Sequence, residues 1–69
     1  MDYEAFIAER IAQLRVQKGV SALDMSLRVG QSKNYINNIE NRRALPSMIV
    51  FFYICEYLGV TPQEFFEQG

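Results

Sequence analysis

Glycine and hydroxyl residues divide this chain into short helical segments, and this division constrains the fold more than any other feature. Gly19, Gly30 and Gly59 each follow a helix-forming stretch, where a left-handed residue commonly ends a helix. Ser21 and Thr61 stand three residues before an acidic residue, a spacing typical of helix starts. No stretch alternates with a period of two for long enough to form a strand. The sequence therefore predicts an all-α chain.

Apolar spacing and the caps predict five helices. They are expected at residues 2–18, from Ser21 to Gly30, from Ser32 as N-cap to about Asn41, at residues 48–58 after Pro46-Ser47, and from Thr61 onward. Since 69 residues leave room for one core, we expect a single domain, residues 1–69, folded as a compact five-helix bundle.

Composition excludes several classes of function. The chain has no histidine and one cysteine, Cys55, which is expected to be a buried thiol. Its carboxylates are scattered and its glycines form no phosphate loop, so we expect no enzyme, metal, cofactor or small-molecule ligand. The longest apolar run, residues 48–55, is too short to span a bilayer, and the acidic start differs from a basic leader. We expect a cytoplasmic protein with no membrane partner.

The order of the charges is uneven although the net charge is only −1. Residues 10–43 contain all seven basic residues and only Asp24 and Glu40 among the acids, whereas the two ends carry acids alone. A basic middle is a candidate site for a polyanion. A random scatter of surface charge explains this order equally well, so charge alone does not decide.

The third predicted helix has one face of amide and ammonium groups. At 100° per residue, one arc holds Lys33, Asn34, Asn37, Asn38 and Asn41, and a second holds Tyr35, Ile36 and Ile39. An ordinary solvated face would also be polar, but asparagine is a poor helix former and a plain surface favours Glu, Lys or Gln. Lysine can donate to guanine O6 and N7, and asparagine can pair with adenine N6 and N7.

Short motifs follow one register along the whole chain. They are Ile11-x-x-Leu14-Arg15-x-x-x-Gly19-Val20-Ser21, Met25-Ser26-x-x-Val29-Gly30, Ser32-x-x-Tyr35-Ile36-x-x-Ile39-Glu40-Asn41, Pro46-Ser47 and Leu58-Gly59-Val60-Thr61. This register resembles the Cro/C1-type (XRE-like) helix-turn-helix repressor DNA-binding domain. The resemblance implies a lambda-repressor-like bundle with the helix-turn-helix in the second and third helices, the third being the recognition helix.

The resemblance also implies roles for individual residues. It assigns base contacts to Ser32, Lys33, Asn34, Asn37 and Asn38, and phosphate contacts to Arg15, Asn41, Arg42 and Arg43. It pairs Arg15 with Glu40 in a partly buried salt bridge. The chain departs from the family pattern at Ala22, where glutamine is usual, at Gln31, where an apolar residue is usual, and at Arg42, where glycine is common.

The fourth predicted helix is apolar on nearly every side. Its core face is expected to hold Met48, Phe51, Ile54, Cys55 and Leu58. The other side holds Ile49, Val50, Phe52, Tyr53 and Tyr57, with Glu56 as the polar exception. We expect a homodimer through Ile49, Phe52, Tyr53 and Tyr57, joined by the fifth helix and the region of Phe65 and Phe66.

These observations predict a sequence-specific regulator of transcription, a small stand-alone repressor that inserts its third helix into the major groove of double-stranded DNA. The alternative is a non-enzymatic interaction module on the same scaffold, in which DNA binding is vestigial and the fourth helix binds another protein. Ala22 and the low pI of about 5.2 favour this alternative.

Overall fold

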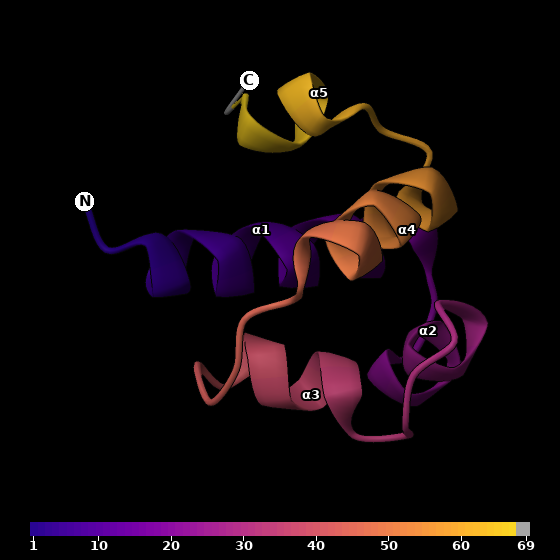
Figure 1. Ribbon diagram of the computed structural model, residues 1–69. Coiled ribbons are helices and arrows are strands. Elements are labelled where there is room, and N and C mark those ends of the chain that lie inside the picture. The colour runs from indigo at the N-terminus through magenta and orange to yellow at the C-terminus, as the bar shows by residue number, and fades with distance from the viewer. Residues whose placement is uncertain (68–69) are drawn as a thin grey trace.

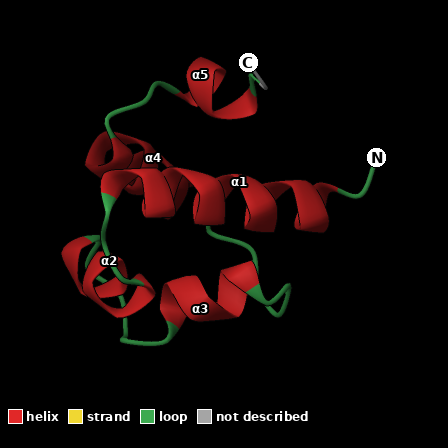
Figure 2. Cartoon of the chain, turned by 180° about the vertical axis from the view of Figure 1, so that it is seen from behind, coloured by secondary structure: helices red, strands yellow, loops and turns green. Residues whose placement is uncertain are grey.

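The structure, a computed structural model, describes residues 1–67, which form five helices and no strand. The helices are α1 (Tyr3–Lys18), α2 (Ala22–Arg28), α3 (Tyr35–Glu40), α4 (Met48–Leu58) and α5 (Pro62–Phe66). Helix α1 crosses the middle of the molecule with α4 in front of it, α2 and α3 lie below the two, and α5 lies above them (Figure 1). The view from behind shows α4 partly hidden by α1, with α5 again above and α2 and α3 below (Figure 2). The all-α prediction is confirmed.

Local capping sets the ends of four helices as the sequence predicts. Ser21 Oγ accepts from the Asp24 amide at 3.0 Å, and Ser47 caps α4 through the Val50 amide. Thr61 and Glu64 form a reciprocal capping box, with proline at the first helical position of α5. Helices α1 and α4 each end in a left-handed glycine. These boundaries follow from nearest neighbours in the chain.

The start of α3 differs from the prediction. Ser32 is not the N-cap; the helix begins at Tyr35, and Asn34 precedes it without a side-chain capping bond. The Tyr35 amide donates to the Ser32 carbonyl at 3.1 Å, so residues 32–35 form a tight turn and not a first turn of α-helix. Ser32, Lys33 and Asn34 therefore stand on the turn that leads into α3, and only Asn37 and Asn38 of the predicted base contacts lie within the helix.

The core lies where α1, α2, α3 and α4 meet, and α5 covers it with the buried Phe65. Helix α4 contributes Val50, Ile54 and Cys55, whereas Met48 is 70% exposed. The predicted core face of α4 was therefore wrong at Met48 and Val50. The buried face runs through positions 50, 54 and 55, so Met48 lies beside an open apolar groove of about 290 Å³ lined also by Leu45 and Phe66.

Arg10 fastens α5 to α1 through a contact that the sequence did not predict. Its Nε donates to the Phe65 carbonyl at 2.6 Å and its Nη2 to the Glu64 carbonyl at 2.8 Å. A cation at the carbonyl end of a helix is also favoured by the helix dipole. Although Arg10 belongs to the basic middle of the sequence, its guanidinium group binds the carbonyl end of α5.

Candidate nucleic-acid interface

Helices α2 and α3 are joined by a turn that contains Gly30, whose φ of 78° is left-handed as the sequence predicts. Ser26 holds the two helices together. Its Oγ accepts from the Ile36 amide at 2.9 Å and donates to the Ala22 carbonyl at 2.7 Å, and the residue is fully buried. Ser26 thereby caps the first turn of α3 from α2, which explains why Ser32 is not needed as the cap.

An ion pair sets the position of α3 against α1. Arg15 Nε lies 2.7 Å from Glu40 Oε2, and Arg15 Nη2 lies 3.1 Å from Glu40 Oε1, so the ion pair expected from the sequence is present. Arg15 Nη1 also donates to the Val20 carbonyl. The hydrogen bonds that Arg15 donates to the Glu40 carboxylate raise the pKa of Arg15, against an opposing effect of burial. Each terminal guanidinium nitrogen of Arg15 keeps one further N–H, so its phosphate contact stays a prediction.

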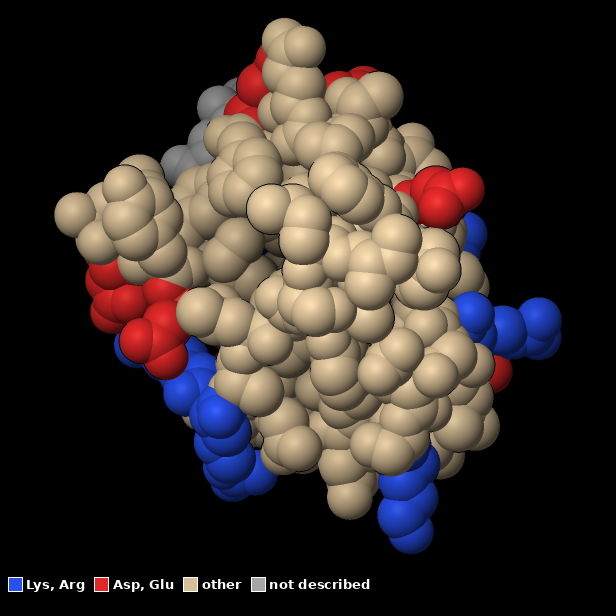
Figure 3. Space-filling view, viewed as in Figure 1, with Lys and Arg blue, Asp and Glu red and all other residues tan. Residues whose placement is uncertain are grey.

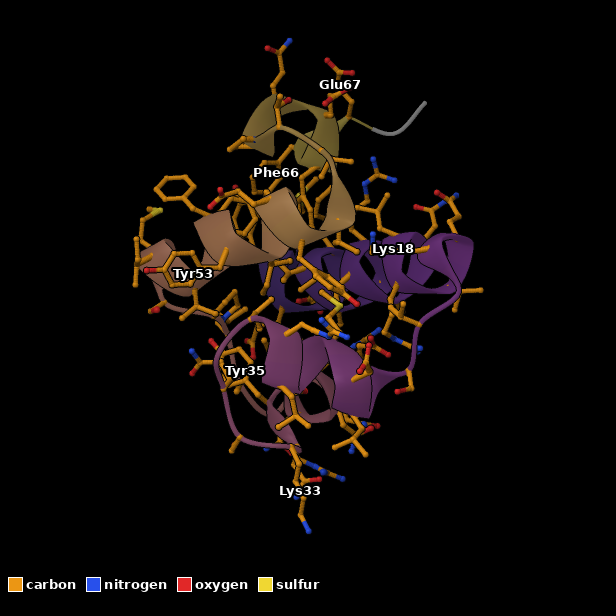
Figure 4. The ribbon with its side chains drawn as sticks, turned by 90° about the vertical axis from the view of Figure 1, so that its right-hand side faces the viewer. Lys18, Lys33, Tyr35, Tyr53, Phe66 and Glu67 are labelled. Atoms are coloured by element: carbon orange, nitrogen blue, oxygen red, sulfur yellow. The ribbon has the colours of Figure 1, made fainter. Side chains whose placement is uncertain are left out.

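The polar residues assigned to base contacts gather around α3, opposite the buried Ile36 and Ile39. They lie at the surface, with Asn38 partly buried and Ser32, Lys33, Asn34 and Asn37 exposed. Lys33 points away from the body of the protein, beyond the turn before α3 (Figure 4). This turn and the first part of α3 form a protruding polar edge, whose ammonium and amide groups can bond to the edges of DNA bases.

Two asparagines of this edge are linked to the residues that follow α3. Asn41 Nδ2 donates to the Asn37 Oδ1 at 3.1 Å, and Arg43 Nη1 donates to the Asn38 Oδ1 at 3.4 Å. The structure thus brings two predicted base-contacting residues, Asn37 and Asn38, together with two predicted phosphate-binding residues, Asn41 and Arg43. Sequence reasoning missed these links because they depend on how the chain turns after α3.

The turn after α3 is left-handed at Arg42, with a φ of 62°. Arg42 is the single non-glycine residue with positive φ among residues 1–67, which accounts for the family's frequent glycine at this position. Its Nη2 lies 3.7 Å from Glu9 Oε1 on α1. Arg42 and Arg43 are both exposed beside the end of α3.

Charged side chains are unevenly distributed over the face that Figure 3 shows. In the space-filling view, basic side chains project from the lower half, around α2 and α3, and acidic ones lie mainly higher (Figure 3). The centre of this face, over α4, holds no charged side chain. The order of charges noted in the sequence is reflected only in part, because Glu9 lies against Arg42 and Asp24 against Arg28.

Helix α4 leaves an apolar stripe at the surface. Ile49, Phe52 and Tyr53 are exposed together with Met48. Tyr57 is only partly exposed, so the prediction that it lies on the outer face of α4 holds only in part. Lys18 Nζ lies 5.0 Å from the centre of the Tyr57 ring. Tyr53 and Lys33 lie on different faces of the molecule, one beside α4 and one below α3 (Figure 4). The apolar stripe and the polar edge are separate surfaces.

Two structural findings bear on other kinds of function. No cluster of acidic, cysteine or histidine side chains that could hold a metal ion occurs within residues 1–67. Over the same residues, no helix has the length and apolar character needed to cross a membrane. Cys55 is buried as predicted, and burial raises the pKa of its thiol.

The sequence matches the family model of the helix-turn-helix domain over residues 8–68. It is 30% identical, over 93% of its length, to an uncharacterised helix-turn-helix transcriptional regulator, y4dJ, of Sinorhizobium fredii, and the match covers 83% of that relative.

Two solved structures share the fold. The hypothetical transcription factor NHTF from Neisseria superposes with a TM-score of 0.82 and 26% identity, over 91% of this chain and 80% of that one. The restriction-modification controller protein C.AhdI from Aeromonas hydrophila superposes with a TM-score of 0.86 and 21% identity, over 96% of this chain and all of the other. The second likeness concerns the fold alone.

Proposed function

The chain belongs to the helix-turn-helix domain family of DNA-binding transcriptional regulators, and from this premise we propose that it reads double-stranded DNA with α3 and acts as a small repressor. The observation that carries the proposal is the protruding polar edge of residues 32–38, set on a helix whose other side is anchored in the core. An exposed edge on a helix anchored in the core can enter the major groove without a change in the fold, so that only side chains need to turn. One domain carries this function.

Within this proposal, base readout falls to Ser32, Lys33, Asn34, Asn37 and Asn38. The residues of the turn enter the groove first, because the N-terminal end of a recognition helix commonly makes the base contacts. Asn34 is exposed on that turn, so its amide is free to pair with an adenine edge. The Asn37 and Asn38 amides would exchange their present bonds to Asn41 and Arg43 for contacts with bases.

Phosphate contacts fall to Asn41, Arg42 and Arg43 after α3, with the remaining N–H groups of Arg15 behind them. A guanidinium group on a loop positions a protein on the duplex by binding phosphate, and this contact carries no sequence information. Because these residues lie beside the end of α3, they would contact the phosphates of one DNA strand, at the edge of the groove that α3 enters. The affinity they supply should fall with added salt.

We further propose a homodimer formed through α4. The exposed stripe of Met48, Ile49, Phe52 and Tyr53 belongs to α4, and the exposed Phe66 of α5 extends it. The face over α4 holds no charged side chain at its centre (Figure 3). Tyr57 contributes its exposed edge. Such a contiguous apolar surface on a small protein typically marks a contact site. A twofold dimer would place two copies of α3 about 34 Å apart and imply a palindromic operator.

Selection from a library of randomised duplexes at low salt tests DNA reading. The proposal predicts an enriched motif with twofold symmetry. Asn34→Ala should cost about 1 to 3 kcal/mol on the preferred site and relax the preference at one base pair. Arg43→Gln is the matched control, because it should weaken all duplexes alike. Recovery of no motif would favour an interaction module without DNA reading.

Sedimentation equilibrium tests the homodimer. The wild type should sediment as a dimer at micromolar concentration, and Tyr53→Glu should sediment as a monomer because it buries a charge at the interface. Leu27→Glu is the matched control, since Leu27 is an exposed apolar residue on α2, outside the stripe. A monomeric wild type would contradict the dimer and leave the stripe to another protein.

A further inference from the structure

An acidic side chain lies against one of the candidate phosphate ligands. Glu9 is on the middle of α1, and its Oε1 is 3.7 Å from Arg42 Nη2. Both side chains are open to solvent, with exposed fractions of 74% for Glu9 and 53% for Arg42. The contact therefore forms at the surface, beside the end of α3.

Arg42 differs in this respect from the other arginines near α3. Arg15 forms a fork with Glu40 in which both side chains are mostly buried, so that pair is part of the scaffold. Arg43 donates to the neutral amide of Asn38, so its charge is not offset by that contact. Arg42 is the arginine that must exchange one anion, the Glu9 carboxylate, for another, a phosphate.

We propose that Glu9 competes with DNA for Arg42 and thereby limits the affinity of the protein for every duplex. This inference rests on the proposed DNA-binding function and adds a residue that acts against it. The competition has two parts. Arg42 loses an ion pair when it turns to a phosphate, and the carboxylate that it leaves behind repels the same phosphate.

The competition is reversible because the ion pair is exposed. Exposed pairs stabilise a protein only weakly, so DNA can displace Glu9 without disturbing the fold. The displaced carboxylate takes up a cation from solution, which cancels part of the counterion release that the phosphate contact provides. The wild type should therefore show both weaker binding and a weaker salt dependence than a protein without this carboxylate.

The left-handed backbone at Arg42 supports this arrangement. It turns the chain sharply straight after α3, and the side chain at this position reaches back toward α1. A glycine at the same position would make the turn without strain but would carry no guanidinium. Arg42 thus adds a positive charge to the side that we propose faces DNA, and the Glu9 carboxylate offsets part of that charge.

The test compares Glu9→Gln with the wild type and with Glu4→Gln. Glu4→Gln makes the same change in net charge on the same helix, in the first turn of α1. Binding of a short fluorescent duplex of mixed sequence is followed between about 50 and 200 mM salt. We expect Glu9→Gln to bind about three- to ten-fold more tightly at the lowest salt. Its plot of log affinity against log salt should be steeper by up to about 0.9.

Arg42→Gln separates the competition from a general effect of charge. In the Arg42→Gln background, Glu9→Gln should lose at least half of its gain, because the cation for which Glu9 competes is gone. An equal gain in both backgrounds, or an equal gain from Glu4→Gln, overturns the inference.

The same titrations distinguish this inference from the function on which it rests. A wild type that binds the duplex while Glu9→Gln gains nothing contradicts the role of Glu9 alone. A wild type that binds neither this duplex nor any selected one contradicts the proposed function and the inference with it. Urea unfolding of each variant should stay close to that of the wild type, since the pair is exposed.

Discussion

Ser26→Ala tests whether one buried hydroxyl on α2 holds the recognition helix in place. Ser26 is fully buried, and its Oγ is the acceptor for the Ile36 amide at 2.9 Å. That amide belongs to the first turn of α3, where no earlier carbonyl of the helix accepts from it. Neither Ser32 nor Asn34 offers a side-chain cap in its place.

The magnitude follows from the burial. Removing the hydroxyl leaves a buried N–H without a partner, which costs about 1 to 3 kcal/mol. Alanine is nearly as large as serine, so a cavity adds little, and we expect a loss of about 2 kcal/mol. A core of this size rarely supplies more than about 3 to 5 kcal/mol. In a domain of this length each kcal/mol lost lowers the melting temperature by about 4 to 8 °C, so the expected loss should lower it by about 8 to 16 °C.

Urea unfolding followed by circular dichroism measures the loss, and amide hydrogen exchange locates it at Ile36. Ser47→Ala is the matched control, because it removes an exposed serine cap with a longer bond of 3.4 Å and should cost less. If Ser26→Ala stays within about 0.5 kcal/mol of the wild type and the Ile36 amide remains protected, the reasoning about this cap is wrong.

Three further predictions concern the scaffold. Glu40→Gln should lower the free energy of unfolding by about 1.5 to 3 kcal/mol in urea, because Arg15 loses a charged partner in a site where both side chains are mostly buried. Arg42→Gly should leave the unfolding free energy unchanged or raise it by up to about 1 kcal/mol, since glycine adopts the left-handed backbone without strain. A decrease of more than about 1 kcal/mol would show that the backbone at Arg42 is not strained. Because burial raises the pKa of the Cys55 thiol and of the Tyr35 phenol, the folded state keeps these protons where the unfolded chain has released them, so stability should fall as pH rises above about 9. Cys55→Ala should flatten that fall, measured as urea midpoints across pH.

The helices that the sequence predicted accurately are those whose ends depend on close neighbours in the chain. Ser21, Ser47 and Thr61 cap amides three residues ahead, and such spacings are visible in a sequence. Gly19 and Gly59 end helices for an equally local reason. The all-α class and most boundaries therefore follow from local chemistry.

The features that the sequence did not predict depend on distant parts of the chain. Helix α3 begins late because its cap is Ser26, ten residues before Ile36. Arg10 caps α5 across 55 residues, which no local pattern indicates. The ion pair of Arg15 with Glu40 was expected only through the family resemblance, since spacing alone could not place two such residues together.

The buried face of α4 shows a different limit. With apolar residues on nearly every side, a helix has no clear polar face from which to find its rotation. The prediction placed Met48 in the core and Val50 outside, whereas the structure has the reverse. The packing of α4 against α1 and α5 decides the rotation, and that packing requires the tertiary structure.

The most direct test of DNA reading by α3 is a titration of the protein with a selected duplex, followed by amide chemical shifts. The account predicts the largest shift changes at residues 32–38 and 41–43, saturating with the duplex, and small changes along the exposed stripe of α4. Changes concentrated on that stripe, or none at low salt, would contradict the assignment of α3 as the recognition helix.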